Sequence, residues 1–202
     1  MCYRISLKTG IKELASRFRA RLDNPDYQLP ADEVNGFTFA AHPILTDSKR
    51  DLISTDFHWG LIPHWSKDEK IRTNTLNARA ETLADKPAFR DAMLQRCLVP
   101  VTSFYEWRWL DDRGKAKQKY EIGVGDEPIF SLGGIWSVWT SPEGELQRTF
   151  SIVTIDANPL MSYIHNTKKR MPLILDAQQE SKWLDGLPVA EMEIPELIAF
   201  KL

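Results

Sequence analysis

The 202-residue sequence has few cysteines and no long apolar run. Its two cysteines, Cys2 and Cys97, are too few for a disulfide framework and favour a reducing compartment, so we expect a cytoplasmic protein. No apolar stretch is long enough for a transmembrane helix, and the first 20 residues are rich in charge where a signal peptide would be apolar. Because CxxC pairs and clustered histidines are also missing, we expect no metal and no other cofactor.

An excess of basic residues is missing as well. The formal net charge of −2 excludes a generally basic nucleic-acid-binding domain, so any affinity for nucleic acid must come from a local patch. The densest cationic run is Lys168, Lys169 and Arg170. With 43% hydrophobic and 27% charged residues, the composition is that of a globular protein with a sizeable core. We expect one domain over residues 1–202 and a monomer.

Aromatic and β-branched segments separated by turn residues predict a protein rich in strands. The predicted strands are 36–41, 55–62, 96–101, 103–109, 117–123, 128–139 and 146–155. Turn residues at 111–115 and 141–145 predict hairpins and therefore antiparallel pairing. The predicted helices are 11–22, 87–94, 158–164 and one that is capped by Asp176 and ended by Gly186. The pattern predicts an α+β fold with a mostly antiparallel, barrel-like β-sheet and flanking helices.

Cys2 is the most informative residue of the chain. Removal of an initiator methionine is favoured by a small second residue, and loss of Met1 would give Cys2 a free α-amine beside its thiol. Such a 1,2-aminothiol condenses with an aldehyde through the amine and then closes a five-membered ring through the thiol. The alternative is an ordinary cysteine that stands early in the chain.

Glu106 and Asn77 are polar residues that the local pattern does not require. Alternation along 103–109 places Glu106 on one face with Phe104 and Arg108. A carboxyl group among aromatic side chains is partly desolvated, which raises its pKa and suits acid–base catalysis. An ion pair with Arg108 on a solvated sheet face is the alternative. Asn77 precedes a short predicted helix, and its alternative is a turn residue.

His165 ends a predicted helix and opens the basic run, which Pro172 and an apolar strand follow. Backbone amides and cations at such a helix end can bind a phosphate, although a lone histidine is often structural. The chain also has seven tryptophans, most of which we expect in the core. One or two of them can instead stack on nucleobases, and we assign Trp65 to this group.

Five segments together resemble the SRAP family, the SOS-response-associated peptidase domain. They are Met1, Cys2 and Arg4 at the start, WGLIPHW (59–65), NARAET (77–82), RCLVPVTSFYEW (96–107) and IHNTKKRMPLIL (164–175). The resemblance implies a pseudo-barrel of β-strands with flanking helices. It also implies a protein that senses abasic sites in single-stranded DNA and attaches to them covalently, as a thiazolidine, through Cys2 once Met1 is removed. Such a protein would associate with the nucleoid when bound to DNA.

The resemblance also implies roles for individual residues. Cys2 would form the crosslink, Asn77 would position the cysteine and the sugar, Glu106 would be the acid–base group, and His165 would handle the proton at the opening deoxyribose ring. The DNA-binding set would be Arg4, Trp65, Arg79, Lys168, Lys169, Arg170 and Pro172. The chain departs from the family in a longer run between His165 and Arg170, and in FAAHP (39–43), where the family has N-x-AP.

Two other functions stay open at this point. One is a peptidase or hydrolase in which the Cys2 thiolate attacks an amide and the terminal amine acts as base. The other is a module that binds single strands or modified bases without a covalent bond.

Overall fold

The computed structural model describes residues 2–30 and 33–202, so the expected removal of Met1 lies outside the described residues. The strands are β1 (Arg4–Ser6), β2 (Arg21–Leu22), β3 (Val34–Asn35), β4 (Ala41–Thr46), β5 (Lys49–Trp59), β6 (Asn77–Arg79), β7 (Arg96–Val101), β8 (Ser103–Trp109), β9 (Lys117–Val124), β10 (Phe130–Thr140), β11 (Leu146–Asp156), β12 (Arg170–Pro172), β13 (Ile174–Leu175) and β14 (Leu197–Lys201). The α-helices are α1 (Ile11–Phe18), α2 (Pro159–Ile164) and α3 (Ala177–Leu184), and 3₁₀ helices cover Gly36–Thr38, Glu69–Asn74, Ala80–Thr82, Arg90–Ala92 and Val189–Glu191. None of the described helices is long and apolar enough to cross a membrane.

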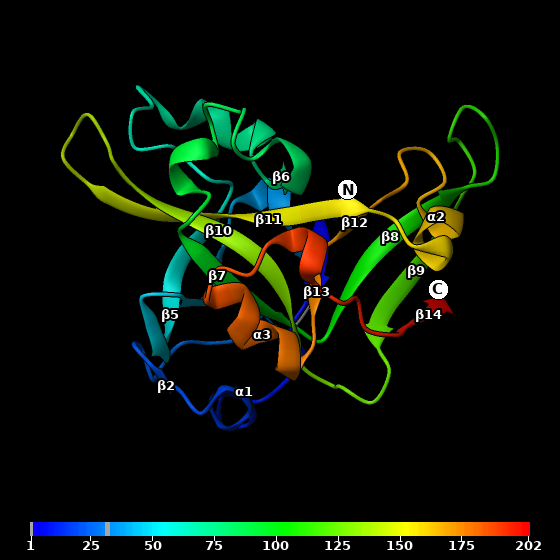
Figure 1. Cartoon of the computed structure of the whole chain (residues 1–202), viewed down its shortest axis with the longest axis horizontal. Helices are drawn as coiled ribbons and strands as arrows, with labels where there is room; N and C mark the ends of the chain where they lie inside the picture. Colours follow the sequence, from blue (N-terminus) through cyan, green and yellow to red (C-terminus); the bar gives the residue numbers. More distant parts are fainter. Residues whose placement is uncertain (1, 31–32) are drawn as a thin grey trace.

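A closed barrel forms the centre of the described part of the chain (Figure 1). Its strands follow the order β11, β10, β7, β4 and β5, and β5 pairs back with β11. The pairs are antiparallel except for this last one, which is parallel and places Phe150 opposite Trp59. The two rings are nearly parallel, with centroids 6.1 Å apart. Closure pairs the two outer strands of this sheet with each other, so that neither presents an open edge along the paired residues.

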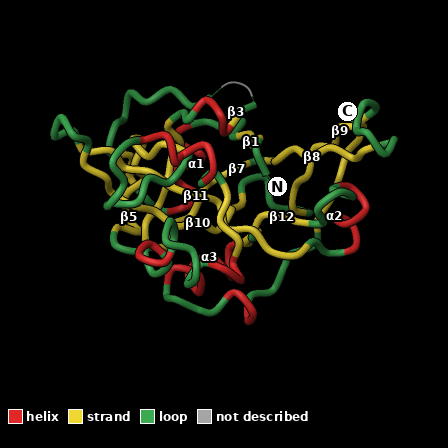
Figure 2. Tube along the Cα trace, turned by 90° about the horizontal axis from the view of Figure 1, so that it is seen from above, coloured by secondary structure: helices red, strands yellow, loops and turns green. Residues whose placement is uncertain are grey.

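A second, antiparallel sheet lies beside the barrel in the order β14, β9, β8, β1 and β3. The chain passes from β7 of the barrel into β8 through the single residue Thr102, whose backbone N–H donates to Ser6 in β1. Figure 2 shows β8 and β9 extending from the barrel toward α2. The predicted α+β fold with a barrel-like, mostly antiparallel sheet is confirmed.

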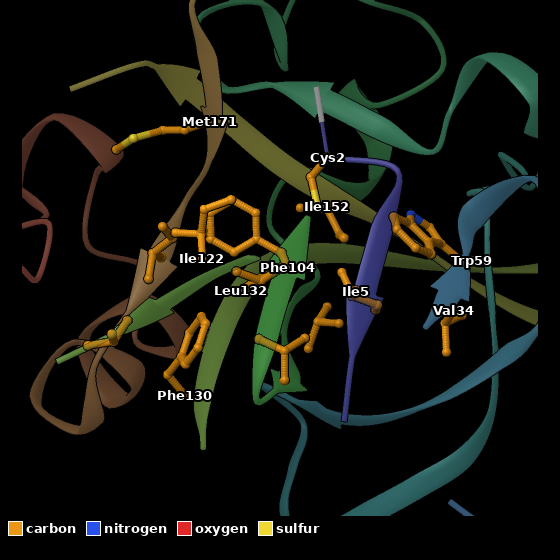
Figure 3. Packing of buried hydrophobic residues seen from close by; sticks show 14 of the residues in the cluster. Cys2, Ile5, Val34, Trp59, Phe104, Ile122, Phe130, Leu132, Ile152 and Met171 are labelled. Atoms are coloured by element: carbon orange, nitrogen blue, oxygen red, sulfur yellow. The ribbon is translucent and has the colours of Figure 1, made fainter. Parts of the chain in front are cut away.

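The two faces of β7 show how the barrel is packed. Cys97, Val99 and Val101 belong to one buried cluster, which continues into the second sheet (Figure 3). Leu98 points the other way, into a cluster that includes Trp183 of α3. The indole N–H of Trp183 donates to the carbonyl oxygen of Cys97 at 3.0 Å. The alternation along β7 therefore divides its side chains between two places. One set packs in the core shared by the two sheets, and the other packs under the helices.

Three sequence predictions of local structure are wrong. The helix predicted over 11–22 ends at Phe18, because Arg19 adopts a left-handed conformation with φ 50° and the chain turns to pair β2 with β5. Residues 36–41 form a 3₁₀ turn before β4, since the Asn35 side chain accepts from the N–H of Phe37. The segment 87–94 contains turns and a 3₁₀ helix in place of an α-helix. In the first two cases, strand pairing or side-chain capping overrides a weak periodic pattern.

Gly134 in β10 gives a test of the barrel packing. A Cβ atom at this position would lie 2.8 Å from Cys97 Sγ and 3.1 Å from the backbone oxygen of Ser151. We expect Gly134→Ala to lower the free energy of unfolding by about 1–3 kcal/mol, as for other overpacked cores. Gly125→Ala is the matched control, because its nearest neighbour is 4.0 Å away. Urea denaturation measures both, and equal midpoints for the two variants would contradict the packing described here.

Candidate functional site

The barrel holds the start of the chain through Asn77. This residue opens β6, which pairs with β11 and places Asn77 opposite Ile152. The indole N–H of Trp59 donates to the carbonyl oxygen of the preceding Leu76 at 2.8 Å. With its backbone fixed in this way, Asn77 donates from Nδ2 to the carbonyl oxygen of Cys2 at 2.9 Å.

The Cys2 side chain is fully buried, at 0% exposure. Figure 3 shows it among the side chains of the buried cluster, together with Ile5, Trp59 and Ile152. Burial raises the pKa of the Cys2 thiol well above its usual range, and the negative charge of Glu106 raises it further. The thiol is therefore protonated at neutral pH.

Glu106 lies on the inner face of β8 and is 6% exposed. It stands opposite Tyr120 of β9, on the same face of the strand as Phe104. Arg108 donates to the backbone carbonyl of Tyr163 and lies 3.9 Å over the ring of that tyrosine. The solvated sheet face considered from the sequence is therefore not the environment of Glu106. Burial raises the pKa of its carboxyl group to about 7.

His165 follows the last residue of α2 and is buried. Its Nδ1 lies 2.8 Å from the carbonyl oxygen of Arg170 and 3.2 Å from the backbone nitrogen of the same residue. Because a carbonyl oxygen can accept but not donate, the shorter contact favours a proton on Nδ1 and leaves Nε2 as the acceptor. Burial, together with the charge of Lys168, lowers the pKa of His165 to about 4. The imidazole is therefore neutral at pH 7.

Glu106 and His165 line one open cavity of about 290 Å³. The lining residues are Tyr3, Glu106, Trp107, Trp109, Lys117, His165, Thr167 and Lys168. Tyr3 directly follows Cys2 in the chain, and Ile5 of β1 pairs with Phe104 of β8, two residues before Glu106. The cavity combines an acid–base pair with aromatic and cationic walls. No group of three or more histidine, cysteine or acidic side chains in the described ranges could hold a metal ion.

Comparison with known proteins agrees with the sequence resemblance. The profile of the family described as "SOS response associated peptidase (SRAP)" matches residues 1–200. The chain belongs to the SRAP family. It is 36% identical over 191 residues to the abasic site processing protein YoqW of Bacillus subtilis, in a match that covers 92% of this chain and 80% of YoqW. It is 34% identical over 173 residues to the abasic site processing protein HMCES of Gallus gallus, in a match that covers 73% of this chain and 50% of HMCES.

A solved structure shows the same fold. The crystal structure of a protein from Bacteroides thetaiotaomicron superposes with a TM-score of 0.89 at 38% sequence identity, covering 100% of this chain and 92% of that one. The barrel and the second sheet of this SRAP chain are therefore an arrangement that a crystallised protein of similar sequence also has.

Most of the cations expected to bind DNA are accessible in this SRAP structure. Arg79 at the end of β6 and Lys168 and Lys169 after α2 are exposed. Arg4 is partly exposed; it forms an ion pair of 2.6 Å with Glu33 and lies over the ring of Trp107. Trp65 is 46% exposed on the loop after β5 but does not line the cavity beside Glu106.

Arg170 and Pro172 of the expected DNA-binding set, in contrast, are both buried. The Arg170 guanidinium forms ion pairs with Glu81 at 2.8 Å and Asp156 at 2.6 Å. It also donates to the backbone oxygen of Thr154 at 2.8 Å. A guanidinium held by two carboxylates inside the protein is not available to a phosphate. The backbone of Arg170 instead fixes the orientation of His165.

The sequence reasoning missed Asn166, which ties the His165 loop to β8. Its side-chain oxygen accepts from the Trp109 N–H, and its side-chain nitrogen donates to the Trp109 carbonyl, both at 3.0 Å. The Asn166 side chain therefore forms the two hydrogen bonds that the backbone of a neighbouring strand would form. They connect the loop that contains His165 to β8, the strand that contains Glu106. An asparagine directly after the predicted helix end was the available signal.

The raised pKa of Glu106 predicts a pH-dependent stability. Because the folded chain favours the protonated carboxyl group, this contribution is full below the unfolded pKa near 4.5 and is lost as pH rises through about 7. We expect Glu106→Gln to gain on the order of 3 kcal/mol relative to the wild type between pH 5 and pH 8. Urea denaturation at both pH values measures it, with the exposed Glu143→Gln as control. Parallel pH profiles for wild type and Glu106→Gln would refute a buried, uncharged Glu106.

Proposed function

We propose that this SRAP protein senses abasic sites in single-stranded DNA and captures them covalently through Cys2 after the loss of Met1, shielding the lesion during the DNA damage response. The relatives named abasic site processing proteins support the class of lesion. The observation that carries the proposal is the hydrogen bond from Asn77 to Cys2, next to the cavity that Glu106 and His165 line. We place the protein in the cytoplasm, and on the nucleoid when it is bound to DNA, which suits its two free cysteines.

The first step opens the sugar and joins it to the amine. Neutral His165 accepts the hydroxyl proton of the closed deoxyribose, and protonated Glu106 donates to the ring oxygen, which leaves an aldehyde. The Cys2 amine bonds to the aldehyde carbon in its neutral form; an α-amine has a reference pKa of about 7.7–8.0. The carbonyl oxygen then departs as one water molecule, and a Schiff base remains. A carboxyl group with a pKa of about 7 can both donate and accept protons in this sequence.

The second step closes the ring. The Cys2 sulfur bonds to the imine carbon, and the thiol proton passes to the imine nitrogen, either directly or through Glu106. The product is a thiazolidine, and one water is lost overall. Because amine and thiol belong to one residue, the closure is intramolecular and has a high effective concentration. Trapping of the imine also prevents the β-elimination that would cut the strand.

The cavity surface suits a single strand. Trp107 and Trp109 offer aromatic faces to unpaired bases, while Lys117 and Lys168 can neutralise phosphates. Lys117 already lies over the ring of Trp109, at 5.2 Å from its centroid. A duplex would keep its bases stacked and away from these rings.

The protonated thiol makes a peptidase the weaker interpretation. A cysteine hydrolase needs a thiolate as its first nucleophile, whereas burial raises the pKa of the Cys2 thiol. Crosslinking begins at the amine and does not need a thiolate in its first step. Intact mass of protein made without methionine aminopeptidase separates the two interpretations, because spontaneous loss of Met1 would favour self-cleavage.

The proposal predicts an SDS-resistant adduct with a single-stranded oligonucleotide that contains one abasic site. Its mass should be one water less than the sum of the two components. Cys2→Ala keeps a terminal amine, so we expect it to form an imine that survives SDS only after borohydride reduction. Cys97→Ala, which removes the other cysteine, should form the adduct normally. A stable adduct of Cys2→Ala without reduction would exclude the thiazolidine.

Exposed lysines should control noncovalent affinity. With a single strand that carries an unreactive tetrahydrofuran residue at the lesion position, we expect Lys168→Ala and Lys169→Ala to weaken binding and to lower the slope of log affinity against log salt by about 0.7 for each phosphate that is no longer neutralised. Lys182→Ala on α3, also exposed, is the control. Fluorescence anisotropy at several salt concentrations measures the slopes. Unchanged slopes for both loop variants would show that these lysines are only solvated surface.

A further inference from the structure

A second cavity lies beside Asn77, apart from the one that Glu106 and His165 line. It has a volume of about 420 Å³, larger than the first, and the two share no described lining residue. Its walls come from the 3₁₀ helix Glu69–Asn74, from β6 and from the segment 80–89. We call it the Phe89 pocket, after the buried aromatic residue in its lining. Its size is in the range of ligand-binding cavities.

The walls of the Phe89 pocket are of two kinds. Ile71, Ala88 and Phe89 give it an apolar surface, and Arg79 and Lys86 are exposed side chains that also line it. None of the described lining residues is acidic. An apolar cavity with two cations matches a nucleotide, whose planar base avoids water and whose phosphate is anionic. An acidic or purely aliphatic ligand would satisfy one of the two features and not the other.

Asn77 links this pocket to the reactive residue. It lines the Phe89 pocket and donates to the Cys2 carbonyl at 2.9 Å. The pocket is therefore separated from Cys2 by one side chain. A DNA single strand whose abasic site lies at Cys2 must continue in both directions from that site. On the side of Asn77, the Phe89 pocket is the concave surface next to the lesion.

We propose that the Phe89 pocket binds the nucleobase of the nucleotide adjacent to the abasic site, with Arg79 and Lys86 on the flanking phosphates. This inference rests on the proposed function and adds a preference for a lesion that has an intact neighbour. Contact of one base with an aromatic side chain typically changes affinity by roughly 5- to 150-fold.

The test compares oligonucleotides with one reactive abasic site. The neighbouring position, on the 5′ or the 3′ side, carries either thymine or a tetrahydrofuran residue that has no base and cannot react. At limiting protein, we expect wild type to form the adduct at least about fivefold faster with thymine on one of the two sides. Ala88→Trp, which fills the pocket, should reduce this ratio to about one, whereas Ala84→Trp, in the same segment but outside the lining, should keep it.

The outcomes are distinguishable from failure of the proposed function, which would remove the adduct with every substrate. Equal rates of wild type with thymine and tetrahydrofuran on both sides would overturn the base pocket. The same ratio in Ala88→Trp as in wild type would also overturn it. If Ala88→Trp does not fold, Ala88→Leu, a smaller filling, should still lower the ratio by at least half.

Discussion

The hydrogen bond between Asn77 and the Cys2 carbonyl is the constraint on which the site depends. Residue 2 lies outside the strands, since β1 begins at Arg4. Asn77, in contrast, sits on β6, which the closed barrel holds through β11 and through the hydrogen bond from Trp59 to Leu76. The Asn77 side-chain amide thus connects the first residues of the chain to the barrel. This is why residue 2 has a defined position although it lies outside the strands.

One physical cause sets the protonation states at the site. Removal from water disfavours whichever form of a group is charged. It raises the pKa of Glu106 and of the Cys2 thiol, and it lowers the pKa of His165. The Cys2 thiol and the His165 imidazole are thereby neutral at cellular pH, and the Glu106 carboxyl group titrates close to it. A neutral imidazole, a protonated thiol and a carboxyl group that titrates near neutral pH suit the proton transfers of the proposed crosslinking, without a strong nucleophile that would attack other electrophiles.

Much of the fold could be predicted from the sequence, but the site only in part. Strands 96–101 and 103–109 have the predicted bounds, because β-branched and aromatic residues favour extended backbone in them. The alternation that put Glu106 with Phe104 is also observed. The burial of Arg170 was not predictable, because its partners include Glu81, which is 89 positions away and meets it only when β6 pairs with β11. Asn166 was missed for a similar reason: its two hydrogen bonds reach a strand 57 positions earlier.

The burial of Cys2 has a consequence for the timing of biosynthesis. Its neighbours Asn77 and Glu106 are far later in the chain, and His165 later still, so the ribosome exposes the terminus long before the pocket around it exists. The loss of Met1 that the proposed function requires would therefore take place on the nascent chain, before Cys2 is buried. Slow folding through such long-range strand pairing lengthens that interval. Under the proposed function, the architecture that buries the thiol in the finished protein thus leaves maturation to the period of translation.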